Sequence, residues 1–68
     1  MELIINHQKK TYTEPSLTLE ALLLLEAPSG LKGVAVALNN HVVPKNLWAS
    51  TLLQNSDNIL IISATQGG

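Results

Sequence analysis

The stretch Asn58–Ser63, "NILIIS", has four consecutive apolar residues and is followed by five further residues of the 68-residue chain. A short run of β-branched and aliphatic residues between polar neighbours predicts a β-strand. A second apolar run, Glu2–Asn6 ("ELIIN"), predicts another strand at the other end of the sequence. Because both runs are strongly apolar, we expect the two strands to be neighbours in the middle of one sheet.

The sequence between these two strands predicts three shorter strands. After a turn at His7–Lys9, alternation with β-branched and aromatic residues predicts a strand over Lys10–Glu14, which Pro15 ends. Small residues predict a strand over Val34–Leu38. A tight turn at Asn39 and Asn40 leads from it into a short strand over 41–43, before Pro44.

One helix is predicted between the second and third strands. Thr18 is a good N-cap, and Glu20 places an acid in the first turn, where the helix dipole favours it. The expected buried stripe is formed by Leu19, Leu22, Leu23 and Ala27, with Leu24 and Leu25 widening it, and Pro28 and Gly30 end the helix. A single helical turn over 45–50, with Asn46 as its possible cap, carries Leu47 and Trp48.

The predicted order is therefore two strands, a helix, two strands, a short helical turn and a last strand. This order predicts an α+β domain in which one helix packs across one face of a mixed sheet of about five strands, which is the β-grasp (ubiquitin-like) arrangement. We expect residues 1–64 to form the domain and residues 65–68 to form a flexible tail.

Composition argues against several classes of protein. Four lysines, no arginine and five acidic residues give a net charge of −1, unlike the basic surface of a nucleic-acid-binding protein. No apolar stretch approaches the roughly 20 residues that span a bilayer, and no signal peptide is apparent, so we expect a soluble cytoplasmic protein. The chain has no cysteine.

The sequence shows no catalytic or metal-binding cluster. The two histidines, His7 and His41, fall in or beside predicted turns, and two ligands would not complete a zinc site. The five acidic residues are scattered and form no acid–base pair. We therefore expect no metal, no cofactor bound by this chain, and no enzyme activity of its own.

The polar tail ends in Gly67 and Gly68, for which two interpretations exist. Glycine at a chain end costs nothing structurally, so the pair can be idle. Alternatively, the terminal carboxylate is the reactive group, and glycine gives it the narrow, side-chain-free backbone that threads into a partner's active site.

Several residues at fixed spacing resemble the ThiS family of thiamine-biosynthesis sulfur carriers. They are Asn39, the Val-Pro-basic-x-x-Trp element Val43, Pro44, Lys45 and Trp48, Asp57, and the terminal Gly67 and Gly68. The similarity covers essentially the whole chain. The sequence departs from the family pattern at Lys45, where arginine is common, at Ser56, where glycine is usual, and at Gln66, where a small residue is usual.

The resemblance implies a function for the tail. A ThiF-like adenylyltransferase would use ATP and magnesium to adenylate the Gly68 carboxylate, with Gly67 and Gln66 entering its channel. Sulfur from cysteine, delivered as a persulfide by a cysteine desulfurase, would convert the adenylate to a thiocarboxylate. That group would supply sulfur to the thiazole synthase, ThiG.

The last strand is apolar on both faces, and one helix can cover only one of them. Ile59 and Ile61 share one face, and Leu60 and Ile62 the other. We expect Leu60 and Ile62, with Ile4 and Leu47, to form an exposed patch that docks on the partner enzymes. Lys45, at the basic position of the family motif, is included among these partner-binding residues. Trp48 is expected to be a core residue that seals the edge of the sheet.

Three other functions remain open from the sequence. The first is another β-grasp sulfur carrier, of the type found as the small subunit of molybdopterin synthase. The second is a ubiquitin-like modifier that is joined to lysines of target proteins. The third is an interaction domain whose tail has no role.

Overall fold

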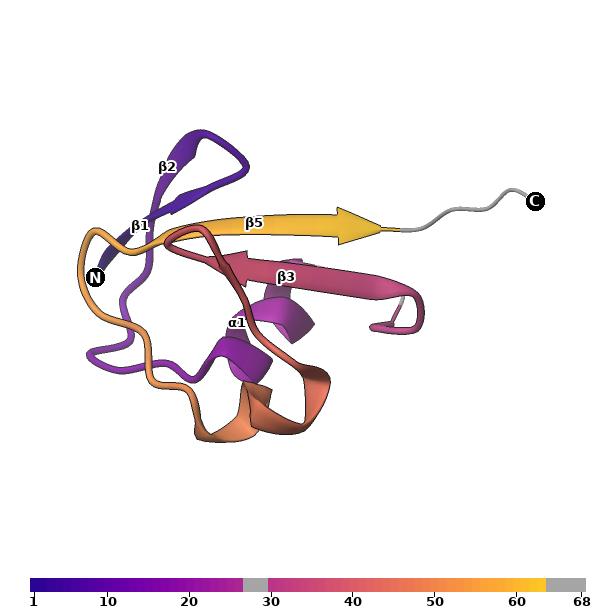
Figure 1. Cartoon of the computed structure of the whole chain (residues 1–68). Coiled ribbons are helices and arrows are strands. Elements are labelled where there is room, and N and C mark those ends of the chain that lie inside the picture. Colours follow the sequence, from indigo (N-terminus) through magenta and orange to yellow (C-terminus); the bar gives the residue numbers. More distant parts are fainter. Residues whose placement is uncertain (27–29, 64–68) are drawn as a thin grey trace.

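The computed structural model describes residues 1–26 and 30–63, and a five-stranded mixed sheet lies at its centre (Figure 1). The strands are β1 (Glu2–Ile5), β2 (Gln8–Thr11), β3 (Val34–Leu38), β4 (His41–Val42) and β5 (Asn58–Ser63). An α-helix, α1 (Leu19–Glu26), follows β2, and a 3₁₀ helix, η1 (Lys45–Ser50), follows β4. The strand order across the sheet is β2-β1-β5-β3-β4.

The two apolar strands from opposite ends of the sequence pair with each other, as predicted. β1 and β5 are parallel, with Ile5 opposite Ile59. The Ile4 amide donates to the Asp57 carbonyl at 2.9 Å, and the Asn6 amide donates to the Ile59 carbonyl at 2.9 Å. β5 pairs with β3 on its other side in antiparallel register. The last strand of the chain is therefore the central strand of the sheet.

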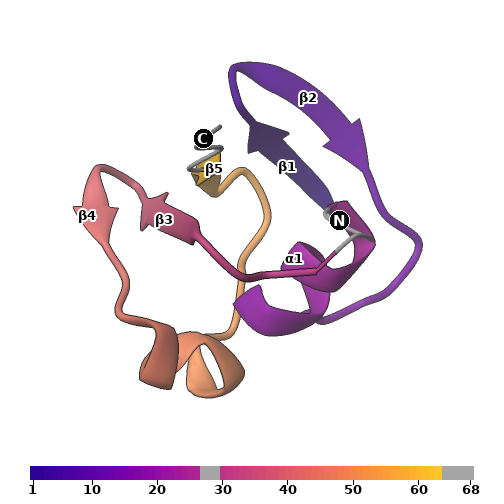
Figure 2. The same cartoon turned by 90° about the vertical axis from the view of Figure 1, so that its right-hand side faces the viewer.

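Both helices lie on one side of the sheet (Figure 2). The predicted cap of α1 is confirmed, because the Ala21 amide donates to the Thr18 hydroxyl at 3.1 Å. The predicted stripe is also confirmed at three positions, where Leu19, Leu22 and Leu23 are fully buried. The core between the layers is formed by Leu3, Ile5, Leu17, Leu19, Leu22, Leu23, Val36, Trp48, Leu53 and Ile59. Ala27 and Pro28, named in the helix prediction, lie outside the described residues.

The first hairpin turns earlier than predicted. Ile5 pairs with Gln8, so the turn is formed by Asn6 and His7 rather than by His7–Lys9, and β2 ends at Thr11 rather than at residue 14. Both turn residues have positive φ, +50° and +70°, which is the backbone conformation of the tight two-residue hairpin that matches the twist of its strands. Asn6 tolerates this conformation better than most residues do.

The second hairpin follows the prediction more closely. Asn39 and Asn40 form its turn, and both have positive φ. β4 ends at Val42, one residue earlier than expected. The predicted cap at Asn46 is wrong: the residue at the N-cap of η1 is Pro44, and no side chain caps this end. The 3₁₀ turn instead closes with a bond from the Leu47 amide to the Pro44 carbonyl at 2.9 Å.

Ser56 is held in a conformation that suits glycine, which the family pattern has at this position. Its φ is +73°, in the left-handed region that a side chain makes unfavourable by about 1 kcal/mol. The position is fixed by a short hydrogen bond from the Ser56 amide to the Glu2 carbonyl at 2.6 Å. The turn before β5 is therefore kept despite the serine, at a cost in backbone strain.

This strain predicts that Ser56→Gly stabilises the protein. Relief of the strain outweighs the extra freedom of glycine in the unfolded chain, and we expect the free energy of unfolding to rise by about 0.5 kcal/mol. Urea denaturation followed by circular dichroism measures it. Ser50→Gly is the matched control: Ser50 lies in η1 without positive φ, and this variant should lose about 1 kcal/mol. Equal destabilisation by both variants would contradict the inference that the backbone is strained at Ser56.

Candidate functional site

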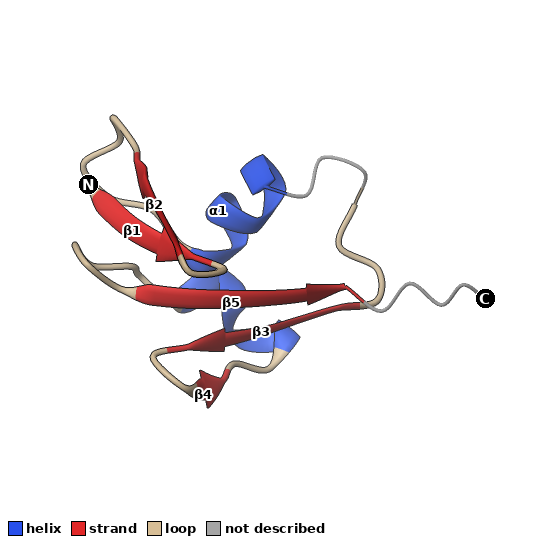
Figure 3. Cartoon of the chain, turned by 90° about the horizontal axis from the view of Figure 1, so that it is seen from above, coloured by secondary structure: helices blue, strands red, loops and turns tan. Residues whose placement is uncertain are grey.

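The sheet face opposite the helices carries a patch of exposed apolar side chains. Figure 3 looks onto this outer face, with both helices behind the sheet. The strand pairing places Leu60 opposite Ala37 and Ile62 opposite Ala35. We define the outer-face patch as Ala35, Ala37, Val42, Leu60 and Ile62, which share one face by strand alternation and register.

Exposure within the outer-face patch agrees with the predicted division of β5. Ile59 is fully buried on the helix side, whereas Leu60 and Ile62 are 37% and 53% exposed. Val42, on the neighbouring edge strand, is 77% exposed. The small side chains of Ala35 and Ala37 lie beside the larger ones of β5, which therefore project from the sheet. The outer face thus offers a contiguous apolar contact surface.

The structure does not bring all of the predicted contact residues together. Ile4 lies on the outer face, opposite Asn58, and is partly buried. Leu47 is exposed on η1, which lies on the α1 side of the sheet, so it is separate from Leu60 and Ile62 (Figure 2). Lys45 is exposed at the start of η1. The predicted patch is therefore divided between two sides of the molecule.

The predicted reactive terminus lies beyond the described part of the chain. Gln66, Gly67 and Gly68, and the proposed boundary between residues 64 and 65, all fall in residues 64–68, which are outside the described residues. The described chain ends at Ser63, the last residue of the central strand.

Two of the residues that carry the family resemblance hold the entry to β5. The Asn39 side chain accepts a hydrogen bond from the Asn58 amide at 3.0 Å and donates one to the Asp57 carboxylate at 3.1 Å. The other oxygen of Asp57 accepts from the Gln54 amide at 2.8 Å. These bonds join the β3–β4 turn to the start of β5, so both residues have a structural function.

The tryptophan of the Val-Pro-basic-x-x-Trp element has a structural role. Trp48 is 2% exposed, as predicted for a core residue, and its indole N–H donates to the Val43 carbonyl at 2.9 Å. A buried indole requires such a partner for its N–H. The ring therefore anchors η1 to the segment that follows β4.

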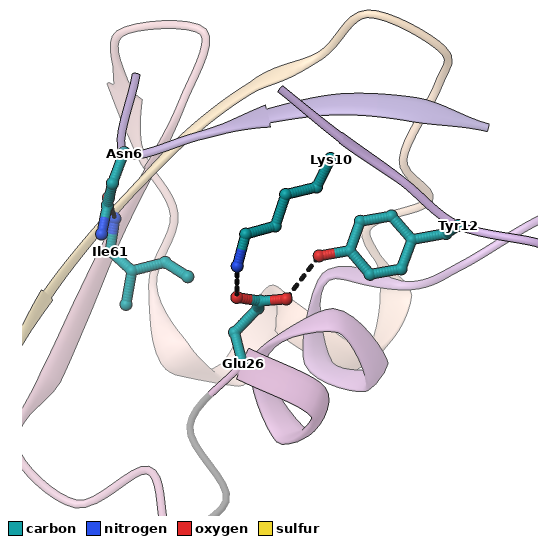
Figure 4. Close-up of polar contacts among 5 residues, drawn as sticks. All are labelled: Asn6, Lys10, Tyr12, Glu26 and Ile61. Carbon is teal, nitrogen blue, oxygen red and sulfur yellow. Dashed lines mark hydrogen bonds and ion pairs between the residues drawn. The ribbon is translucent and has the colours of Figure 1, made fainter. Parts of the chain in front are cut away.

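A polar cluster that the sequence did not predict joins α1 to the edge strand β2 (Figure 4). The Lys10 ammonium contacts one oxygen of Glu26 at 2.7 Å, and the Tyr12 hydroxyl donates to the other oxygen. Lys10 and Tyr12 are two residues apart and therefore lie on the same side of the chain. This spacing was the one feature of the sequence that could have placed Lys10 and Tyr12 together. It could not identify their partner, because Glu26 is distant in sequence.

The cluster shifts two pKa values in opposite directions. Burial raises the pKa of Tyr12 above its ordinary value, and the hydrogen bond to Glu26 raises it further. Burial alone would raise the pKa of Glu26, but the hydrogen bonds from Lys10 and Tyr12 outweigh it, so the pKa of Glu26 is lowered. The carboxylate is therefore ionised and the phenol protonated at neutral pH.

An open pocket of about 210 Å³ lies beside this cluster, at the end of β5. It is lined by Ile5, Asn6, Gln8, Lys10, Glu26, Ile61 and Ser63. Within residues 1–26 and 30–63, no group of three or more His, Cys, Asp or Glu side chains is placed to hold a metal ion. Neither helix in this part of the chain is long and apolar enough to cross a membrane.

The five-stranded mixed sheet with one α-helix across it is a β-grasp fold. A crystal structure of the thiamine biosynthesis protein ThiS from Geobacter metallireducens matches it with a TM-score of 0.85 and 25% identity, over 100% of both chains. An NMR structure of a thiamine biosynthesis protein from the same organism also matches with a TM-score of 0.85 and 25% identity, over 100% of this chain and 88% of that one.

The family model of the ThiS family matches residues 3–68, and the chain therefore belongs to the ThiS family. Among curated proteins, the sulfur carrier protein ThiS of Escherichia coli K12 is 39% identical over 36 residues. That match covers 53% of this chain and 54% of the relative, so about half the length of each is compared.

The polar cluster predicts an acid-dependent loss of stability. Because the pKa of Glu26 is lower in the folded than in the unfolded chain, its stabilisation is fully present above the unfolded carboxyl pKa of about 4.3. It is lost as the pH falls through the folded pKa. We expect Glu26→Gln to lower the free energy of unfolding by about 1 kcal/mol at pH 7, and by much less at pH 3.

Urea denaturation at a series of pH values tests this dependence. Glu20→Gln is the control, since Glu20 is an exposed acid on the same helix and makes no ion pair within the described residues. A stability difference between the native protein and Glu26→Gln that does not change between pH 7 and pH 3 would show that the ionised carboxylate contributes nothing.

Proposed function

We propose that this chain is the sulfur carrier of thiamine thiazole formation and that its terminal carboxylate carries the sulfur. The observation that carries this proposal is the extent of the family match, which runs from residue 3 through Gly67 and Gly68. The matched relatives, a sulfur carrier protein and a thiamine biosynthesis protein, support it. On this proposal, the folded domain is a substrate of partner enzymes and performs no catalysis itself.

The proposed chemistry occurs at the Gly68 carbonyl carbon. A carboxylate is a poor electrophile, so one of its oxygens first attacks the α-phosphorus of ATP, and pyrophosphate leaves. The enzyme that binds ATP and magnesium is a ThiF-like adenylyltransferase. A persulfide supplied by a cysteine desulfurase then attacks the carbonyl carbon, and the bond to AMP breaks. A thiol cleaves the resulting S–S bond by reduction, which leaves the thiocarboxylate that serves a ThiG-like thiazole synthase.

The fold supports this role by fixing the position of Ser63, the last described residue before the tail. β5 pairs with β1 at Asn58 and Ile59, and with β3 from Ile59 to its last residue, Ser63. The ladder with β3 therefore sets the point at which residues 64–68 begin. Five residues span at most about 17 Å when extended, which sets how far an activating site can lie from the end of the sheet.

The outer-face patch is the proposed docking surface for both partner enzymes. It lies on the strand that leads to the tail, and its largest members, Leu60 and Ile62, are exposed. Exposed apolar clusters of this kind on small proteins mark contact sites. Lys45 and Leu47 are not in this patch, so we propose for them at most a secondary contact on the η1 side.

The proposed chemistry predicts a defined change of mass. After incubation with ATP, magnesium, a ThiF-like enzyme and a sulfur source, intact-mass spectrometry should show replacement of one oxygen by one sulfur. Deletion of Gly68 should abolish the change, because the activated carboxylate is then displaced by one residue. The circular dichroism spectrum of the deleted form should be unchanged, since the core residues described above all precede residue 64.

Other outcomes of the same measurement would favour other functions. Conjugates of higher mass would indicate a ubiquitin-like modifier. Sulfur transfer to a molybdopterin precursor, and none to a thiazole synthase, would indicate a carrier of the molybdopterin type. A mass that never changes would contradict the proposed function and leave an interaction domain with an idle tail.

A charge in the outer-face patch should prevent docking. We expect Leu60→Glu combined with Ile62→Glu to weaken binding to the ThiF-like enzyme at least 30-fold, because each charge would be buried against apolar surface. Leu52→Glu is the matched control: Leu52 is 65% exposed and pairs with Thr18 away from the sheet face, so its affinity should stay within twofold. Isothermal titration calorimetry measures both. Equal affinities for the double variant and the control would contradict the proposal that the outer-face patch is the docking surface.

A further inference from the structure

β1 is too short to pair along the whole of β5. The two strands pair at Asn58 and Ile59 only, because β1 ends at Ile5. On its other side, β5 pairs with β3 as far as Ser63. Among the described strands, residues 60–63 therefore have a neighbour only on the β3 side.

A side chain continues the ladder where β1 stops. The Asn6 amide donates to the Ile59 carbonyl at 2.9 Å, as the next residue of a parallel strand would. The Ile61 amide then donates to the side-chain oxygen of Asn6 at 2.8 Å, and Figure 4 shows these two residues side by side. Asn6 begins the hairpin turn with a φ of +50°, so its backbone leaves the strand there. Its side-chain carbonyl therefore takes the place of a strand carbonyl.

Alternation along β5 shows that this bond is separate from the ladder with β3. The Asn39 amide donates to the Asn58 carbonyl at 2.8 Å, which identifies the residues of β5 that bond to β3. Because alternate residues of a strand direct their backbone groups to opposite neighbours, Leu60 and Ile62 also bond to β3. The Ile61 amide lies between them and points to the other side.

The bonded amide lies between the two largest side chains of the outer-face patch. Within the described part of the chain, its bond to Asn6 is the only hydrogen bond on the β1 side of residues 60–63. Ile61 separates Leu60 from Ile62, so the backbone that carries both contact residues is held at its midpoint. The same bond lies two residues before the end of β5, after which the tail begins.

We propose that Asn6 is a positioning residue of the carrier: its bond to the Ile61 amide holds the end of β5 in the conformation that the adenylating enzyme binds. The inference rests on the proposed function, since it requires that enzyme as the partner. A strand end that is held in advance spares the enzyme the entropic cost of ordering it. Because Asn6 acts through Ile61 and not at the carbonyl carbon of Gly68, it contributes to binding of the carrier and not to the chemical step.

Asn6→Gly tests this assignment, because glycine removes the side chain and adopts positive φ without strain. Asn40→Gly is the matched control: Asn40 has a φ of +72° in the second hairpin, where the side chain that bonds to β5 belongs to Asn39. In an ATP–pyrophosphate exchange assay with the ThiF-like enzyme, Asn6→Gly should raise the KM for the carrier about fivefold, as expected for one lost hydrogen bond, and leave kcat unchanged. Equal KM values for the two glycine variants would overturn the inference.

Asn6→Asp distinguishes the hydrogen bond from other effects of the substitution. Aspartate keeps an oxygen that can accept from the Ile61 amide, and it also tolerates positive φ. The KM of this variant should therefore stay within about twofold of the native value, since the bond is kept. A KM as high as that of Asn6→Gly would contradict a role for the bond.

Amide hydrogen exchange, measured by NMR on the carrier alone, tests the bond without the enzyme. In Asn6→Gly the Ile61 amide should exchange about tenfold faster than in the native chain, while the Leu60 amide, which bonds to β3, should keep its rate. Unchanged exchange at Ile61 would overturn the inference. Faster exchange with an unchanged KM would also overturn it, because Asn6 would then serve the fold alone. A native chain that the enzyme never adenylates would instead contradict the proposed function.

Discussion

The parallel pairing of β1 with β5 is the constraint on which the rest of the structure depends. It joins residues near the two ends of the sequence and places the last strand at the centre of the sheet. β5 pairs with β1 at Asn58 and Ile59 and with β3 from Ile59 to Ser63, so the strand cannot shift in register without breaking both ladders. At Ser63, the residue before the tail, the ladder with β3 fixes the position of the strand.

The same pairing explains why β5 is apolar on both faces. Ile59 and Ile61 face the helix layer and complete the core. Packing against the helices therefore explains the apolar residues at alternate positions of β5, but not the apolar residues between them. Leu60 and Ile62 are not required by the core, since 37% and 53% of their surfaces stay exposed. The exposed part of each side chain contributes nothing to the stability of the described domain. A partner that buries them is the physical reason we infer for retaining them, which links the pattern of the strand to the proposed docking surface.

Most of the fold could be predicted from the sequence because local signals and tertiary packing agree. The alternation in β5, the cap at Thr18 and the burial of Leu19, Leu22 and Leu23 each matched the structure, whereas Leu24 and Leu25, expected to widen the stripe, are exposed. The first hairpin was misplaced because the turn is set by positive φ at Asn6 and His7, a conformation that no apolar pattern reveals. The predicted cap of η1 at Asn46 was wrong because the 3₁₀ turn begins at Pro44 and is closed by a backbone hydrogen bond rather than by a side chain.

The candidate site was less predictable, because its parts meet only in three dimensions. Lys10 and Glu26 come together through the packing of α1 against the hairpin, and neither residue type indicates a site by itself. Leu47 and Leu60 were both expected in one exposed patch, yet Leu47 belongs to η1, which lies on the α1 side of the sheet (Figure 2), and Leu60 belongs to the outer face of β5. Asn39 and Asp57, by contrast, carry the family resemblance and serve the fold, by securing the entry to β5. In this protein two residues of the family motif therefore secure the strand that precedes the tail, and the residues that we propose as the docking surface include Leu60 and Ile62 on the outer face of that same strand.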